Sequence, residues 1–114
     1  MNILSDLVAI MDGLDIPVET GVFSGPAPDE YVVITPMADT FEVHAGDYPR
    51  FEMQEARVSL FSKGSYIKRK NQIVRAFLNG KVTVTARLYV GYEEDTEYYH
   101  YAIDVAKHYE YQEE

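Results

Sequence analysis

The hydrophobic positions of this chain change their period several times, and each change predicts an element of secondary structure. Near the start, apolar residues recur at helical spacing as far as Gly13 and Pro17, which predicts a short amphipathic helix. A second helix is predicted to begin after the N-cap Ser65 and to end before Gly80. The apolar face expected for this second helix consists of Ile67, Ile73, Val74, Phe77 and Leu78.

Shorter runs of β-branched and aromatic residues predict strands over residues 16–23, 31–35, 40–44, 51–61, 82–90 and 98–105. Pro36 is expected to close the strand over 31–35, because proline has no N–H to donate to a ladder. In the run over 51–61, Phe51 and Met53 share one parity and the later apolar residues share the other. A bulge near Glu55 would reconcile the two halves.

The order of these elements predicts the fold class. Helix, strands, helix and two strands indicate a single α+β domain, with an antiparallel or mixed sheet packed against two helices. A chain of 114 residues fits one domain, since two cores of half that size would each be marginally stable. We expect the domain to span residues 1–111 and residues 112–114 to form a disordered tail.

Composition and charge exclude several classes of function. Because the chain contains no cysteine, disulfides, thiolate metal sites and cysteine nucleophiles are excluded. A net charge of −9 repels phosphates and anionic lipids, which argues against nucleic acid or membrane binding as the main role. The first residues lack the features of a signal peptide, and no apolar run approaches the ~20 residues that cross a bilayer, so we expect a soluble cytoplasmic protein.

Tyrosine is the most abundant aromatic residue, with 10 copies, whereas tryptophan is absent. Tyrosine has a high strand propensity, and its amphipathic side chain also suits surfaces that become buried in a complex. The tyrosines therefore indicate either ordinary strand positions or an interface.

Two residue patterns suggest chemistry but have simpler explanations. His100, Asp104 and His108 are ligand types suited to zinc, but they fall in a predicted strand, where residues four apart lie about 13 Å apart. Ser65 and Lys68 match the Ser-x-x-Lys pattern of penicillin-binding enzymes, but the companion motifs are missing, and a helix N-cap accounts for Ser65. We therefore expect solvated polar positions on the sheet and no serine nucleophile.

The remaining charged groups predict no catalytic residue, cofactor or metal site. No pair of carboxylates is fixed as general acid and base, and no glycine-rich phosphate loop occurs. The run 93–95 predicts a solvated acidic loop, with a weak cation site as the alternative. A basic cluster on or near the second helix is either its solvated outer face or a contact surface, for which a second copy of this acidic chain is a better partner than DNA. The cluster consists of Lys63, Lys68, Arg69, Lys70 and Arg75.

Several stretches taken in order resemble a known family. They are residues 16–23 (IPVETGVF), 27–33 (APDEYVV), 57–64 (RVSLFSKG), 92–96 (YEEDT) and 100–105 (HYAIDV). Together these stretches resemble the small tail-completion, or tail-terminator, proteins of long-tailed bacteriophages and of prophages in Gram-positive bacteria.

This resemblance implies a non-enzymatic protein that forms a ring, expected to be a hexamer. The ring would cap the finished tail tube and join tail to head, with tail-tube and head-connector proteins as partners. DNA would pass through the ring without specific binding. The protein would occupy the bacterial cytoplasm during assembly and the tail–head interface in the virion. The residues expected at the subunit interface are Phe41, Tyr48, Phe51, Lys68, Arg69, Arg75 and Tyr98.

Two other functions are kept as alternatives. The acidic charge also suits a small binding domain, an inhibitor or adaptor of a basic partner in a host or prophage system. A small hydrolase using His44 or His100 together with a carboxylate is the enzymatic alternative.

Overall fold

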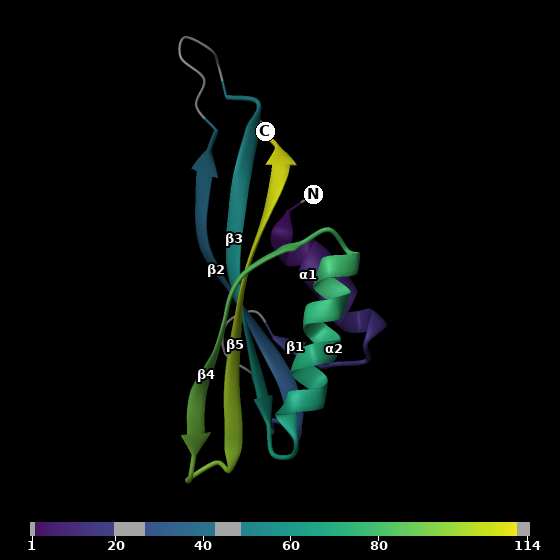
Figure 1. Ribbon diagram of the computed structural model, residues 1–114, viewed down its shortest axis with the longest axis vertical. Coiled ribbons are helices and arrows are strands. Elements are labelled where there is room, and N and C mark those ends of the chain that lie inside the picture. The colour runs from purple at the N-terminus through teal and green to yellow at the C-terminus, as the bar shows by residue number, and fades with distance from the viewer. Residues whose placement is uncertain (1, 20–26, 43–48, 112–114) are drawn as a thin grey trace.

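The computed structural model describes residues 2–19, 27–42 and 49–111. The elements along the chain are α1 (Ile3–Gly13), β1 (Val18–Glu19), β2 (Glu30–Phe41), β3 (Phe51–Ser62), α2 (Tyr66–Asn79), β4 (Thr83–Glu93) and β5 (Tyr98–Glu110). The strands form one sheet in the order β1-β2-β3-β5-β4, with β1 parallel to β2 and the other pairs antiparallel. Both helices lie on one side of this mixed sheet (Figure 1), which confirms the expected α+β fold class.

α1 forms where the apolar period predicts it and is held to the sheet by polar contacts. Its N-cap is Asn2, whose side chain accepts a hydrogen bond from the backbone of Ser5 (2.8 Å). The backbone N–H of Ile3 donates to the side chain of Gln54 in β3 (2.7 Å). These contacts fix the start of the helix, which buries Ile3, Leu7 and Met11.

α2 also begins after the expected residue, but its expected apolar face is only partly correct. Ser65 occupies the N-cap position, although its side chain makes no capping hydrogen bond. Gly80 follows the last turn, where an added Cβ would come within 3.0 Å of Ile10 in α1. Glycine therefore lets the end of the Ile10 side chain pack directly against the last turn of α2. Ile73 and Phe77 are buried, whereas Ile67 and Leu78, which we expected in the core, are exposed.

The core lies between the helices and the middle of the sheet. Even-numbered residues of β3 face the helices, and each is paired in register with a residue of β5 on the same face. This arrangement builds a continuous apolar layer from buried side chains of both helices and of β2, β3 and β5. Its largest fully buried members are Phe77, Leu7, Met11, Ile34, Leu60, Ile73, Ile103, Val32, Val58, Val82 and Val105.

β2 is longer than the sequence predicted, and the expected bulge lies in the neighbouring strand. Pro36 does not end the strand, and residues 40 and 41 continue β2 rather than forming a separate element. The register shifts between Pro36 and Ala38, opposite Ala56 and Glu55, so the extra residue is Met37 in β2. β3 itself pairs with β5 without interruption from Phe51 to Ser62, so no bulge forms at Glu55.

β4 pairs irregularly with its neighbour β5. Its register with β5 shifts at two places, between Val84 and Ala86 and between Tyr89 and Gly91. Leu88 and Val90 are exposed. β4 is therefore an edge strand whose apolar residues mostly remain on the surface of the single chain.

The molecule is elongated, with principal extents of 53 × 26 × 24 Å. One end of the sheet, formed by β2, β3 and β5, projects beyond α1, and the β4–β5 hairpin projects at the opposite end (Figure 1). No helix in the described ranges has the length and apolar character needed to cross a bilayer. The expected tail, residues 112–114, lies outside the described residues.

Candidate functional site

The residues expected at a subunit interface differ in their accessibility. Phe41 and Phe51 are exposed near one end of the sheet, whereas Tyr48 and His44 lie outside the described residues. Tyr98 was expected on a surface, but it is only 8% exposed, and its hydroxyl donates to the carbonyl oxygen of Pro28 (2.6 Å). Tyr98 is therefore largely buried in the single chain, and its expected role at an interface stays a prediction.

The exposed apolar side chains gather on three surfaces. Every large hydrophobic residue that is exposed among residues 2–19, 27–42 and 49–111 belongs to one of them. We call these surfaces the arm, the α2 face and the β4 edge. Their exposed apolar members are Met37, Phe41 and Phe51 on the arm, Ile67 and Leu78 on the α2 face, and Leu88, Tyr89, Val90 and Tyr92 on the β4 edge.

The arm is the projecting end of the sheet, formed by residues 36–42, 49–55 and 106–111. Phe41 pairs with Glu52, whose neighbour Phe51 points to the opposite face, so apolar side chains lie on both faces of the arm. The exposed fractions are 54% for Met37, 44% for Phe41 and 47% for Phe51. Acidic residues outnumber Lys and Arg here; they are Asp39, Glu42, Glu52, Glu55 and Glu110, against Arg50 and Lys107.

Some of the charges on the arm are already paired. Lys107 and the hydroxyl of Tyr109 both donate to Asp6 of α1, at 3.1 and 2.5 Å. Partial burial raises the pKa of the Asp6 carboxyl, but these two hydrogen bonds outweigh it and lower the pKa overall. Burial and the bond to Asp6 raise the pKa of Tyr109. The Nε2 atom of His108 lies 2.6 Å from Glu42. The base of the arm is thus fixed to α1.

The α2 face is the solvent-exposed side of the second helix and is basic. α2 contains four cationic and no acidic side chains. Arg69 pairs with Glu30 (2.7 Å), and Lys70 lies over the ring of Tyr101 (4.6 Å to its centroid). Lys68 and Arg75, seven residues apart, point to solvent on the same side. The exposed members of the α2 face are Ile67, Lys68, Asn71, Gln72, Arg75, Leu78 and Asn79.

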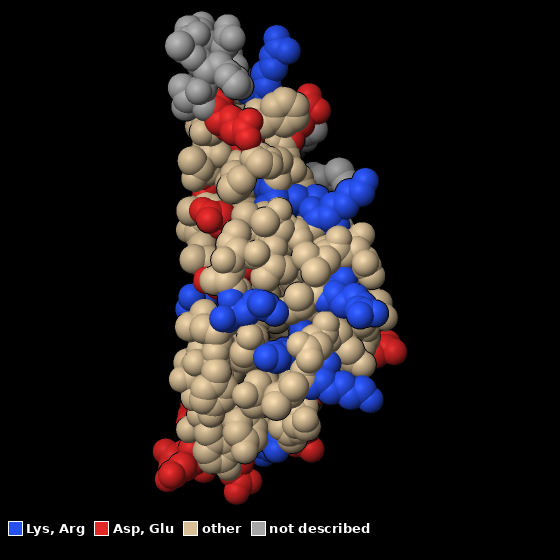
Figure 2. All heavy atoms as spheres, viewed as in Figure 1, with Lys and Arg blue, Asp and Glu red and all other residues tan. Residues whose placement is uncertain are grey.

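Charge is unevenly distributed over the molecule. Figure 2 shows Lys and Arg side chains gathered over its middle, and Asp and Glu side chains mainly toward its two ends.

Shallow pockets lie along the α2 face, one of them lined by Lys68, Asn71, Gln72 and Arg75. A second, between the end of α1 and α2, is lined by Leu14, Arg69, Arg75 and Asn79 among others. The α2 face is therefore a basic surface with apolar residues at its two ends.

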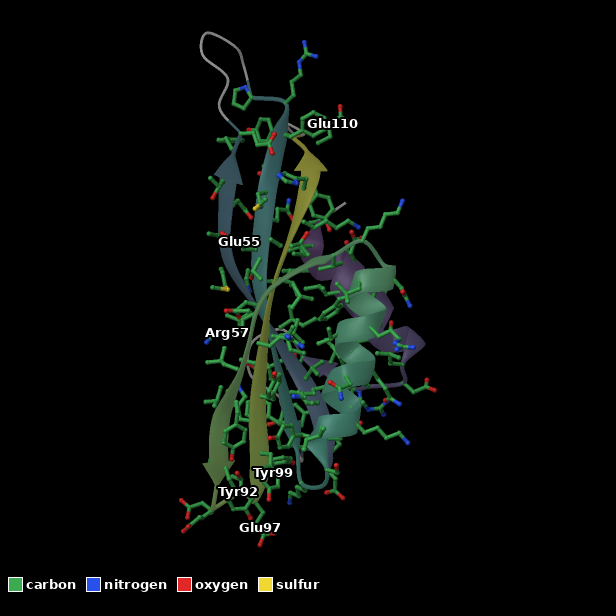
Figure 3. All side chains as sticks on the ribbon, viewed as in Figure 1. Glu55, Arg57, Tyr92, Glu97, Tyr99 and Glu110 are labelled. Atoms are coloured by element: carbon green, nitrogen blue, oxygen red, sulfur yellow. The ribbon has the colours of Figure 1, made fainter. Side chains whose placement is uncertain are left out.

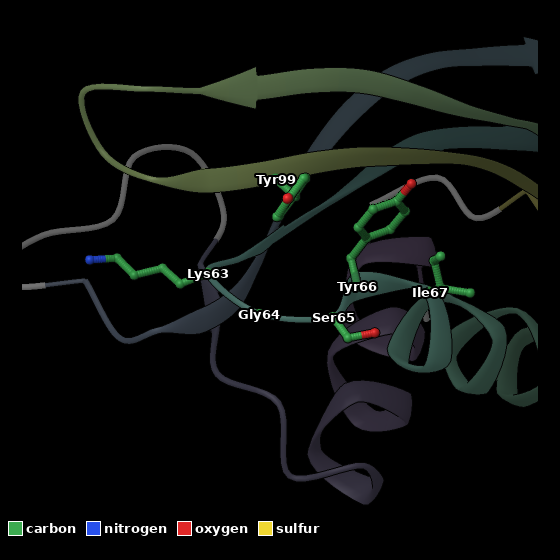
Figure 4. A pocket seen from close by; sticks show the side chains of 6 residues that line it. All are labelled: Lys63, Gly64, Ser65, Tyr66, Ile67 and Tyr99. Carbon is green, nitrogen blue, oxygen red and sulfur yellow. The ribbon is translucent and has the colours of Figure 1, made fainter.

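The β4 edge adjoins a cluster of tyrosines at the other end of the sheet. The ring of Tyr66 lies 5.7 Å from that of Tyr89 and 5.5 Å from that of Tyr99, and Tyr92 lies 4.7 Å from Tyr99. Figure 4 shows the open pocket beside this cluster, lined by Lys63, Gly64, Ser65, Tyr66, Ile67 and Tyr99. Tyrosines on this surface thus combine strand positions with exposed rings.

The face of the sheet turned away from the helices carries the candidate polar chemistry. Arg57 and Asp104 form a two-point ion pair there, at 2.7 and 3.0 Å (Figure 3 labels Arg57). His100 stacks on Phe61, with ring centroids 4.3 Å apart. Burial and the nearby Arg57 lower the pKa of His100. In the part of the chain that the structure describes, no group of three His, Asp or Glu side chains is placed to hold a metal ion.

The Ser-x-x-Lys pattern is not assembled into a reactive pair. Ser65 lies at the start of α2, and neither Ser65 nor Lys68 takes part in a hydrogen bond with the other among the described residues. The residues of the charged turn at 93–97 are all exposed, and Figure 3 shows Glu97 at this end of the molecule and Glu110 at the other. The surfaces described above, rather than a reactive pocket, are therefore the candidate site.

No protein-family model matches the chain, and no curated protein is significantly similar to it. The candidate site thus depends on the geometry and charge of the chain itself.

Proposed function

We propose that this chain is a structural protein of phage assembly, a tail-completion protein that forms a ring, caps the tail tube and joins tail to head. The observation that carries the proposal is the distribution of exposed apolar residues over three separate surfaces of one small subunit. Large apolar patches on a soluble protein mark interaction sites. The sequence resemblance to tail-completion proteins is the reason for proposing a ring at the junction of tail and head as the assembly.

A subunit of a stacked ring needs three kinds of contact. Two different surfaces are needed for its two neighbours in the ring, because head-to-tail contacts between identical subunits join unlike patches. At least one further surface is needed for a tail-tube or head-connector protein. The β4 edge suits this third role, since β4 ends the sheet and carries four exposed apolar side chains. An open strand edge is a template for contact with another chain.

The acidic charge fits a ring through which DNA passes. A net charge of −9 repels phosphates and so disfavours tight binding of the genome. Under this proposal the protein occupies the bacterial cytoplasm during assembly and the junction of tail and head in the virion.

The proposal is tested by deleting the gene from its phage or prophage and examining induced lysates by electron microscopy. The expected result is filled heads without attached tails, together with tails of abnormal length. Supplying the unmodified gene from a plasmid is the control and should restore whole virions. Normal virions from the deletion strain would contradict the proposal.

A small acidic inhibitor or adaptor is the second candidate, and the exposed acidic turn favours it. Four carboxylates occur within five residues there: Glu93, Glu94, Asp95 and Glu97. Such a cluster can attract a basic partner. Recovery of one basic host protein with the tagged chain, and its loss when the four residues are changed to Gln or Asn, would favour this candidate if the chain is absent from purified virions.

A further inference from the structure

We propose that the arm of one copy packs against the α2 face of a second copy, in a head-to-tail contact. This inference rests on the proposed function and deepens it, because it names the two surfaces that would join neighbours in the ring. It follows from three properties of these surfaces: exposed apolar side chains, opposite charge and separate positions on the subunit.

Both surfaces carry exposed apolar side chains, whose removal from water is favourable. Ile67 and Leu78 on the α2 face are 54% and 59% exposed, and the three apolar residues of the arm are exposed to a similar degree. Burying apolar area in a contact stabilises the complex. Met37 contributes to this surface only because the bulge adds it to the edge of β2.

The charges of the two surfaces are opposite and largely unpaired. The cationic Lys68 and Arg75 take part in no ion pair with another described residue. On the arm, the same is true of Glu55 and Glu110, which lie on the same face of the sheet, the one turned away from the helices. Figure 3 shows Glu55 projecting from the sheet on the side away from the helices. Opposite charges at the rim of an interface favour correct pairing and speed association.

The positions of the two surfaces favour a second copy in a head-to-tail arrangement. The arm projects at one end of the sheet, whereas α2 lies beside the other half (Figure 1). An arm-to-arm contact would bring carboxylates together, and a contact between two α2 faces would bring cations together; both like-charge pairings are unfavourable. The contact between unlike surfaces remains, and such a contact repeats from copy to copy until a ring closes.

Cross-linking tests the direction of the contact, and the absence of native cysteine makes it simple. We would prepare Met37→Cys, Leu78→Cys and the double variant, and treat each with a short bis-maleimide. The double variant should give a ladder of covalent oligomers, and a mixture of the two single variants should give dimers. Each single variant by itself should stay monomeric on a denaturing gel.

The control variant for this experiment is Asp95→Cys, which places an exposed thiol in the turn between β4 and β5, outside both surfaces. Mixed with Met37→Cys, it should give no dimer. Efficient dimers from either single variant by itself would show a contact between like surfaces and overturn the inference. Failure of the double variant to cross-link, under conditions where the unmodified chain assembles, would also overturn it.

A charge exchange tests the same contact independently. One variant combines Lys68→Glu with Arg75→Glu, and the other combines Glu55→Lys with Glu110→Lys. Each should associate at least about tenfold more weakly than the unmodified chain, because two attractions become repulsions. A mixture of the two variants should assemble again, since one contact is native and the other is reversed in both partners. Lys81→Glu with Arg87→Glu is the matched control and should assemble normally.

The outcomes separate this inference from the proposed function. If the unmodified chain forms rings and neither variant is impaired, the ring stands but these two surfaces do not form it. If the variants are impaired and the mixture is restored, while virions form normally without the gene, the contact stands and the phage role fails.

Discussion

Phe77 and Leu78 are neighbours in α2, and the structure predicts opposite consequences for truncating them. Phe77 is fully buried in the core, whereas Leu78 is exposed on the α2 face. Phe77→Ala should therefore reduce the free energy of unfolding of the single chain, and Leu78→Ala should leave it nearly unchanged. The contact proposed for Leu78 predicts that its truncation instead weakens self-association.

The magnitude for Phe77 follows from its burial. Truncating a fully buried Phe to Ala costs about 3–5 kcal/mol, because apolar contacts are lost and a cavity remains. For a domain of this length, each kcal/mol lowers the melting temperature by about 4 °C. The expected decrease is therefore about 12–20 °C for Phe77→Ala. For Leu78→Ala, an exposed position, the expected change is within about 0.5 kcal/mol, or about 2 °C.

The assay is thermal and urea unfolding followed by circular dichroism, at a protein concentration low enough to keep the chain monomeric. Low concentration matters because assembly would add apparent stability. Sedimentation of the same samples at high concentration measures association. A loss of stability in Leu78→Ala as large as that in Phe77→Ala would refute the placement of Leu78 on the surface, and with it the α2 face.

Three further predictions concern polar groups. Because the pKa of Asp6 is lowered, its ionised carboxylate stabilises the folded chain above the ordinary pKa of 3.8, and this stabilisation is lost as pH falls through the folded value. Asp6→Asn should therefore reduce the free energy of unfolding at neutral pH but not in acid, where the variant and the unmodified chain become alike. Urea unfolding across pH measures this difference. The lowered pKa of His100 predicts that native stability falls as pH decreases below 6.5, and His100→Phe should flatten this dependence in the same titration. Tyr98→Phe removes the bond to Pro28 and should cost about 1 kcal/mol in urea, whereas no change would contradict the interior position of Tyr98.

The sequence predicted the helices and the fold class because their patterns are local. The apolar period of α1 and the N-cap position of Ser65 both gave the correct element. Ile67 and Leu78 lie roughly 100° around the helix from the buried Ile73 and Phe77. The period alone does not show how much of the apolar stripe is covered by the sheet. The exposed cations of α2 were predicted as a cluster, and their role in contact stays a prediction.

Pro36 shows why the strand boundaries were harder. The backbone N–H of Val32 donates toward β1, to the carbonyl oxygen of Pro17 (2.9 Å), so the nitrogen of Pro36, four residues later, faces the same outer edge. β1 is only two residues long and pairs no further than Val33, so no ladder partner in the described residues is lost at Pro36. Proline therefore fits inside β2, and only knowledge of the neighbouring strand could have predicted this.

The sequence also did not predict those exposed surfaces that depend on how neighbouring strands are paired in register. Met37 reaches the edge because of a bulge, and the alternation of β4 is broken by two register shifts that expose Leu88 and Val90. Likewise, the pairing of Arg57 with Asp104 requires that β3 and β5 be neighbours in a particular register. These are long-range properties, and the sequence pattern of one strand contains no information about them.

The central claim is that this chain works by assembling with copies of itself, and its mass in solution tests that claim most directly. Native mass spectrometry, combined with sedimentation velocity over a range of micromolar concentrations, gives the size of the particle. The account predicts a species with six times the 13.0 kDa mass of the chain, and the fraction of the protein in this species should increase with concentration. A single species of 13.0 kDa at every concentration would contradict it.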